Sequence, residues 1–99
     1  MARFDVYLRP DNAGYLLDVQ ADVLGELNTR IVIPLIPLAQ APLPAKRLNP
    51  VFEIAGQDCA LVTQFKAAVP RAFLGDPVAT LVARDAEISC ALDMLLVGF

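Results

Sequence analysis

Short stretches in which apolar and polar residues alternate predict several β-strands. Residues 4–8 show the alternation that is typical of a half-buried strand. Residues 15–20 follow as a second short strand. Residues 9–14 between them are rich in turn formers, so the two strands are expected to form a hairpin. The β-branched residues 30–33 predict a central buried strand that ends at Pro34.

Prolines interrupt the pattern in the middle of the chain. Five of them fall between residues 34 and 50, and because proline cannot donate to a sheet ladder we expect one long ordered loop there. Residues 51–54 and 59–65 are predicted strands on either side of a turn at 55–58, which indicates a second hairpin. Residues 68–70 and 72–74 are interpreted as short strands or bends.

The C-terminal segment has the spacing of a helix. Asp85 is the expected N-cap, and Gly98 stands where a glycine ends a helix. Apolar residues recur between them at helical intervals, namely Ile88, Ala91, Leu92, Leu95 and Leu96. The pattern predicts one domain over residues 1–99, mainly β, built as a small antiparallel barrel capped by a C-terminal α-helix.

Composition adds an interface to this picture. The chain has 99 residues and is 57% hydrophobic, more than a small core needs, and residues 93–99 are nearly all apolar. Such a surface indicates a homodimer or another protein partner. The longest apolar run, residues 31–39, contains two prolines and is too short to span a membrane. With no signal-peptide pattern at the N-terminus, a cytoplasmic location is expected.

Charge and residue types argue against most chemistry. The net charge is −3 and the eight basic residues are scattered, so the chain alone is not expected to bind nucleic acid. Histidine is absent, which removes the usual general base and the commonest metal ligand. We therefore predict no catalytic residues, no metal and no cofactor. Cys59 and Cys90 are interpreted as buried free thiols, and four acids are interpreted as solvated surface charges: Asp18, Asp22, Glu53 and Asp58.

A ribonuclease is the one enzymatic alternative that these residues leave open. RNA cleavage can use the 2′-hydroxyl of the RNA itself, but the protein then needs a basic face to hold the strand. The candidates for such a face are Arg30, Lys46, Arg47, Lys66 and Arg71. Only the Lys46-Arg47 pair is adjacent, and the acidic net charge disfavours this reading.

Several segments in order resemble the CcdB family of toxins from plasmid and chromosomal toxin–antitoxin pairs. They are residues 18–24, 30–35 and 49–54, followed by Val69-Pro70, Gly75 and the C-terminal helix. The resemblance implies an SH3-like barrel and a homodimer built on the C-terminal helices. It also implies a CcdA-like antitoxin, a role in plasmid maintenance, and poisoning of DNA gyrase through its A subunit. Such a toxin is an inhibitor and not an enzyme.

The resemblance also places functional residues on this chain. The gyrase contacts fall on Val97, Gly98 and Phe99, with further positions at Val23, Leu24 and Asp93. The dimer interface is expected on Ile88, Leu92, Leu95 and Leu96. The best-known members end in Trp-Gly-Ile, so only the glycine matches, and a tryptophan anchor is missing at Val97. We therefore expect the fold, dimer and antitoxin partnership to survive, with gyrase poisoning weakened, retargeted or lost. A domain that only binds its antitoxin is the remaining alternative.

Overall fold

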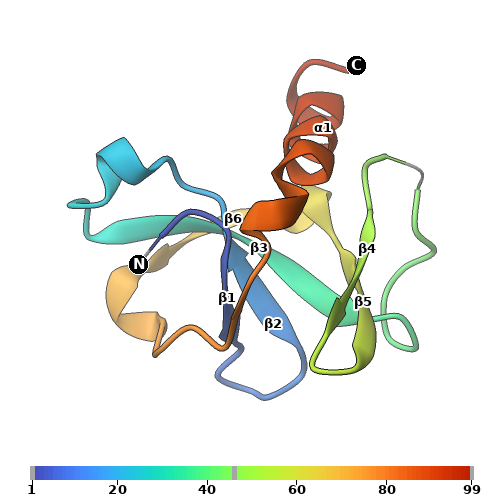
Figure 1. Cartoon of the computed structure of the whole chain (residues 1–99), viewed down its shortest axis with the longest axis horizontal. Helices are drawn as coiled ribbons and strands as arrows, with labels where there is room; N and C mark the ends of the chain where they lie inside the picture. The colour runs from blue at the N-terminus through green and yellow to red at the C-terminus, as the bar shows by residue number, and fades with distance from the viewer. Residues whose placement is uncertain (1, 46, 99) are drawn as a thin grey trace.

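The computed structural model describes residues 2–45 and 47–98, and these form a nearly closed antiparallel sheet with a C-terminal helix (Figure 1). The strands are β1 (Asp5–Leu8), β2 (Tyr15–Asp18), β3 (Thr29–Pro37), β4 (Val51–Ile54), β5 (Gln57–Leu61), β6 (Ala67–Pro70) and β7 (Ala79–Thr80). The α-helix is α1 (Asp85–Leu96), and the 3₁₀ turns are η1 (Asp22–Leu24), η2 (Thr63–Phe65), η3 (Arg71–Phe73) and η4 (Val82–Arg84). The predicted class, mainly β with one C-terminal helix, is confirmed.

Strand β3 is the centre of the sheet. The order of the strands is β4-β5-β3-β2-β1-β7, with β6 paired to β3 as well. Both predicted hairpins are present, because β1 pairs with β2 and β4 pairs with β5. β3 therefore has β2 along one edge, and β5 and β6 share its other edge.

Alternation along the strands separates two clusters of apolar side chains. The larger cluster fills the space between the sheet and α1, which contributes Ile88. Its central members are fully buried: Val6, Leu17, Ile33, Leu35, Phe52 and Leu61. A smaller cluster, made by Tyr7, Val32 and Leu74, lies on the opposite face of the strands. The sheet is thus covered on both faces near β3.

The prediction that the central strand ends at Pro34 is wrong. β3 continues to Pro37, and Pro34 pairs with Leu16 of β2. The carbonyl of Pro34 accepts a hydrogen bond from the N–H of Val62 at 3.0 Å, so this residue directs its backbone polar groups away from β2. Pro34 has no N–H to donate, and it lies between the part of β3 that pairs with β6 (residues 29–32) and the part that pairs with β5 (residues 35–37). Proline is tolerated there because no ladder bond is lost.

Two other predicted strands have different limits. The second hairpin has a tight turn at Ala55 and Gly56, both with positive φ, so β5 begins at Gln57. The same strand ends at Leu61, and the segment predicted to continue it forms η2. Residues 72–74, interpreted as a strand or bend, lie in and just after η3. The loop predicted for residues 34–50 is shorter, because β3 occupies its first part.

Helix α1 ends as predicted but begins one residue earlier than predicted. Asp85 is the first helical residue and not the N-cap, which is Arg84, and no side chain caps this end. Gly98 adopts φ +94° and donates its N–H to the carbonyl of Asp93 at 3.0 Å, a left-handed ending that favours glycine. Among the described residues, no helix has the length and apolar character that crossing a membrane requires.

Candidate protein-interaction site

A partly apolar groove of about 460 Å³ lies between α1 and the loop that carries η1. Figure 1 shows α1 standing away from the sheet, so that one side of the helix is left uncovered. The segment that follows β2 and the start of β3 contribute to the lining of the groove. Its lining residues are Val19, Gln20, Ala21, Leu24, Leu27, Thr29, Ile31, Lys66, Leu92 and Leu96.

Exposed apolar side chains continue from this groove over η1 and the end of α1. Val23 is 89% exposed and Leu96 is 66% exposed. Leu24 and Val97 are also exposed, while Leu92 and Leu95 are half-buried. We call the set Val23, Leu24, Leu92, Leu96 and Val97 the η1–α1 face. An apolar set of this kind on one side of a small protein is typical of an interaction surface.

Ile88 requires a correction to the expected dimer residues. Its side chain is fully buried in the main core, so it supports α1 from beneath and cannot touch a second chain directly. Asp93 and Gly98 are exposed, whereas Phe99 lies outside the described residues. Of the residues predicted from sequence, the groove brings together Leu24, Leu92 and Leu96.

Other groove residues were not predicted as site residues. Gln20, Leu27 and Ile31 line the groove, but none of them was assigned a role from the sequence. Lys66 also lines it and was considered only for the basic face of a ribonuclease. Leu27 could have been predicted, because a large apolar residue in a connection between strands is a candidate for an exposed contact. In the structure it is 49% exposed. Nothing in the sequence indicated a role for Gln20, because that role depends on its side-chain hydrogen bonds to Leu24 and Ile31.

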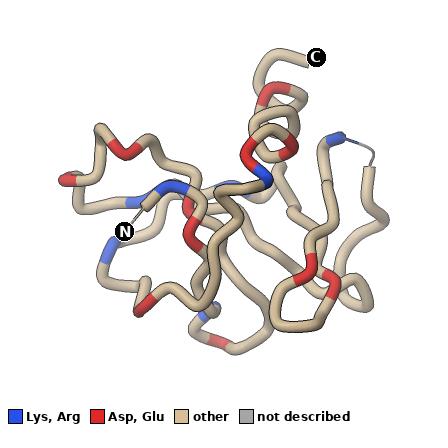
Figure 2. The backbone as a smooth tube through the Cα atoms, in the orientation of Figure 1, with Lys and Arg blue, Asp and Glu red and all other residues tan. Residues whose placement is uncertain are grey.

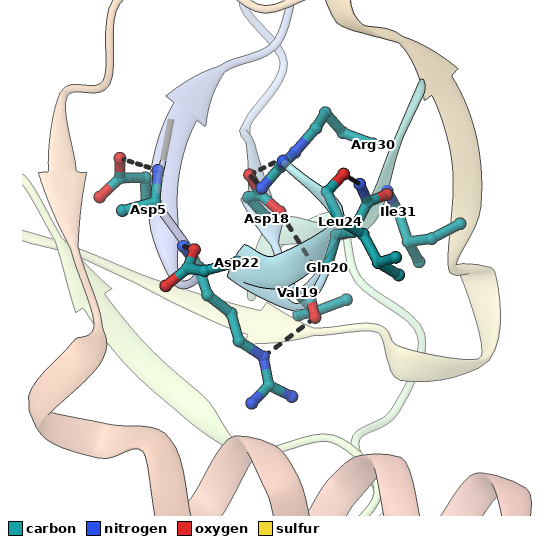
Figure 3. Close-up of polar contacts among 10 residues, drawn as sticks. Asp5, Asp18, Val19, Gln20, Asp22, Leu24, Arg30 and Ile31 are labelled. Atoms are coloured by element: carbon teal, nitrogen blue, oxygen red, sulfur yellow. Dashed lines mark hydrogen bonds and ion pairs between the residues drawn. The ribbon is translucent and has the colours of Figure 1, made fainter. Parts of the chain in front are cut away.

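A buried ion pair lies beneath η1. Arg30 donates from Nε and Nη2 to Oδ2 of Asp18, at 2.9 and 2.6 Å, and both side chains are fully buried (Figure 3). The interpretation of Asp18 as a solvated surface acid is therefore wrong. Arg30, considered for a basic face, is likewise inside the protein. Side chains that are fully buried stay charged only when they are paired and hydrogen-bonded.

Gln20 extends this pair toward the surface. Its backbone N–H donates to Oδ1 of Asp18 at 3.0 Å, and its side-chain Oε1 accepts from the N–H of Ile31 at 3.2 Å. Its Nε2 donates to the carbonyl of Leu24 at 2.8 Å (Figure 3). A continuous set of hydrogen bonds thus runs from Arg30 to the backbone of η1.

Burial changes the acid–base behaviour of two groups here. It raises the pKa of Asp18, while the bonds from Arg30 and from the Gln20 N–H act in the opposite direction. Burial also raises the pKa of Tyr7, which keeps its phenol neutral at physiological pH. The Tyr7 hydroxyl and Nη1 of Arg30 have no hydrogen-bond partner among residues 2–45 and 47–98.

The two cysteines are the remaining groups with possible reactivity in the part of the chain that the structure describes. Burial raises the pKa of the Cys59 thiol, so it is a poor nucleophile, and Cys90 lies 3.7 Å from Nη2 of Arg47. Both cysteines are free. No group of metal-binding side chains occurs in residues 2–45 and 47–98. Figure 2 shows Lys and Arg dispersed along the backbone, and what the described residues do offer is a surface for contact.

Residues 3–98 match the family described as CcdB protein. The chain belongs to the CcdB family. CcdB proteins are toxins of toxin–antitoxin pairs, and membership therefore implies an antitoxin partner. The family is one of protein inhibitors rather than enzymes, which agrees with a site made of exposed apolar side chains. The sequence resemblance to CcdB is confirmed over nearly the whole chain.

Proposed function

We propose that this CcdB-family chain is a toxin that binds and poisons DNA gyrase through its A subunit and is neutralised by a CcdA-like antitoxin. We further propose that its sheet is an SH3-like barrel and that it acts as a homodimer. The observation that carries the proposal is the η1–α1 face, an exposed apolar surface in a chain whose family inhibits by contact. The positions expected to touch gyrase, Val23, Leu24 and Val97, belong to that face.

The dimer is proposed to form along α1. Leu92, Leu95 and Leu96 retain exposed surface on the helix, and the adjacent groove is lined mainly by apolar side chains. A second copy of α1 would cover these three leucines, because a twofold interface places one patch on its own image, and Val23, Leu24 and Val97 would remain for gyrase. Burial of that apolar area supplies the driving force. Ile88 takes no direct part, because it is inside the core.

Charge at the end of α1 favours a basic partner. Asp93 is exposed and lies in the last turn, where the helix has no basic residue. The C-terminal end of a helix carries a partial negative charge, so Asp93 adds to a potential that nothing on the helix offsets. An arginine or lysine of the partner at this position would be favourable, which supports contact with a protein that presents basic residues.

The deciding experiment is a supercoiling and DNA-cleavage assay with gyrase from the matching host and the purified dimer. Linear DNA trapped by the wild-type chain would support gyrase poisoning. Absence of trapping, with an intact dimer and active host gyrase, would overturn it in favour of a retargeted toxin or an antitoxin-binding domain. Cleavage of purified RNA by the chain would instead identify a ribonuclease toxin.

Replacing Val97 with tryptophan is expected to strengthen binding to the gyrase A subunit by about tenfold or more, since tryptophan is enriched among the residues that dominate interfaces. Val97 is 59% exposed, so the larger side chain can be added without disturbing the core. Growth arrest on expression and affinity for the purified A subunit measure the effect.

The matched control for this change is Val82→Trp. Val82 is 58% exposed on η4, so its replacement adds the same apolar area outside the η1–α1 face. Equal toxicity of wild type and Val97→Trp would contradict the proposed anchor role. A gain with Val82→Trp as large as with Val97→Trp would show that added apolar area alone is responsible.

A further inference from the structure

The side chain of Gln20 is the connection between the buried ion pair and the exposed η1 turn. We propose that Gln20 is a positioning residue, which holds Leu24 and Val23 in the geometry that a protein partner binds. This inference rests on the proposed function, because it assumes that the η1–α1 face is the binding surface. It concerns a residue that itself need not touch the partner.

The turn η1 has few other attachments to the core. None of its three residues is buried, and no side chain caps it. Its backbone hydrogen bonds are local: the N–H groups of Leu24, Gly25 and Leu27 donate to the carbonyls of Ala21, Asp22 and Leu24, respectively. One further contact reaches it, from the N–H of Arg3 to Oδ1 of Asp22 at 2.8 Å. With so little burial, η1 is expected to open easily unless polar contacts hold it.

Gln20 supplies such polar contacts from a buried position, because only 5% of the residue is exposed. Its Oε1 is fixed by the N–H of Ile31 in β3, and its Nε2 holds the carbonyl of Leu24 at 2.8 Å. Both ends of the carboxamide are therefore used. An apolar side chain of equal size makes neither bond, and an ionised carboxylate cannot donate to a carbonyl.

The ion pair fixes Gln20 in turn. Asp18 accepts the Gln20 backbone N–H through Oδ1, while Arg30 occupies Oδ2. Asp18 ends β2 and Arg30 lies near the start of β3, so the two strands that flank the η1 loop are joined at the point where the loop leaves them. The loop is thereby anchored at its base and at Leu24. A partner then meets Leu24 already in place and loses less entropy on binding.

The test is Gln20→Met, which keeps the volume and removes both side-chain bonds without burying a charge. We expect affinity for the immobilised gyrase A subunit to fall about tenfold, the effect of one or two hydrogen bonds. Hydrogen exchange of the amides of Gly25 and Leu27 should become faster in the isolated chain, as should that of Ile31, which loses its acceptor. Exchange in β2 and in the rest of β3 should stay as in wild type. Gln57→Met, at an exposed position in the β4–β5 hairpin, is the matched control.

Two results would overturn the positioning role. One is unchanged affinity of Gln20→Met. The other is faster exchange across the whole sheet, which would show a general loss of stability. Gln20→Asn serves as a second variant if Gln20→Met does not fold, because it keeps a neutral carboxamide that is one methylene too short to bond to both Ile31 and Leu24. Wild-type affinity of that variant would also overturn the inference.

Leu24→Asp separates this inference from the proposed function. Leu24 is 47% exposed and lines the groove, so a charge there should abolish A-subunit binding if the η1–α1 face is the site. Binding that survives Leu24→Asp would refute the proposed face itself. Loss of binding in Leu24→Asp together with wild-type affinity in Gln20→Met would leave the face intact and refute only the role of Gln20.

Discussion

Replacing Asp18 with alanine is expected to lower the free energy of unfolding by about 3–5 kcal/mol. Asp18 is fully buried and accepts hydrogen bonds from Arg30 and from the backbone N–H of Gln20. Alanine would leave the Arg30 guanidinium inside the protein without its acceptor, and a buried charge without a partner is strongly unfavourable. Equilibrium unfolding in urea, followed by circular dichroism, measures the change.

The exposed pair of Arg9 and Asp11 is the matched control. Its charged atoms are separated by a similar distance, 2.9 Å, but the side chains are 30% and 56% exposed. Asp11→Ala should therefore cost no more than about 1 kcal/mol. An equal effect of Asp18→Ala and Asp11→Ala would contradict the structure, which places only Asp18 in the interior.

The double variant Asp18→Leu with Arg30→Met refines this prediction. Burial raises the pKa of Asp18 although its bonds to Arg30 act in the opposite direction, and both side chains give up their hydration in the interior. Replacing both charges by apolar groups should then restore much of the stability lost in the single variant. Stability that stays as low as in Asp18→Ala would show that the pair itself is strongly stabilising.

Replacing Leu96 with aspartate is expected to weaken both self-association and partner binding by about 100-fold or more, as loss of a central interface residue does. Leu96 is 66% exposed and lines the groove with Leu24 and Leu92. The new carboxylate would have to lose its water whenever the η1–α1 face is covered, and Asp93 nearby adds repulsion. Sedimentation of the purified chain and growth arrest on expression measure the two effects.

The stability of the monomer distinguishes this effect from unfolding. An exposed position contributes within about 0.5 kcal/mol, so at concentrations below those at which the wild type dimerises, Leu96→Asp should unfold at nearly the same urea concentration as wild type. Val78→Asp is the matched control, because Val78 is 56% exposed and lies just before β7. A Leu96→Asp chain that still dimerises and arrests growth would remove α1 from the proposed interface.

Much of the fold could be predicted because it depends on local patterns. Alternation identified β1, turn residues indicated the hairpins that contain β2 and β4, and helical spacing with Gly98 identified α1. The limits of β3 could not be predicted from Pro34 alone. Whether a proline is tolerated in a strand depends on which neighbours flank it, and here the gap between β5 and β6 falls at that residue.

The site was predictable only in part. The family resemblance indicated Leu24, Leu92 and Leu96, and the structure places these three in one groove. The hidden polar support was not predictable, because Asp18 and Arg30 are twelve residues apart and meet only when β2 and β3 pair. An aspartate in a strand that is predicted to be half-exposed usually faces solvent, so the burial of Asp18 could not be predicted from the sequence.

Strand β3 links the binding surface to the stability of the whole fold. Thr29 and Ile31 of β3 line the groove, and the same strand pairs with β2, β5 and β6. An occupant of the groove that binds only the folded chain would therefore stabilise the sheet as a unit, by about 2.7 kcal/mol at a free concentration one hundred times its Kd. A chain with its groove filled should resist proteases longer than one left alone.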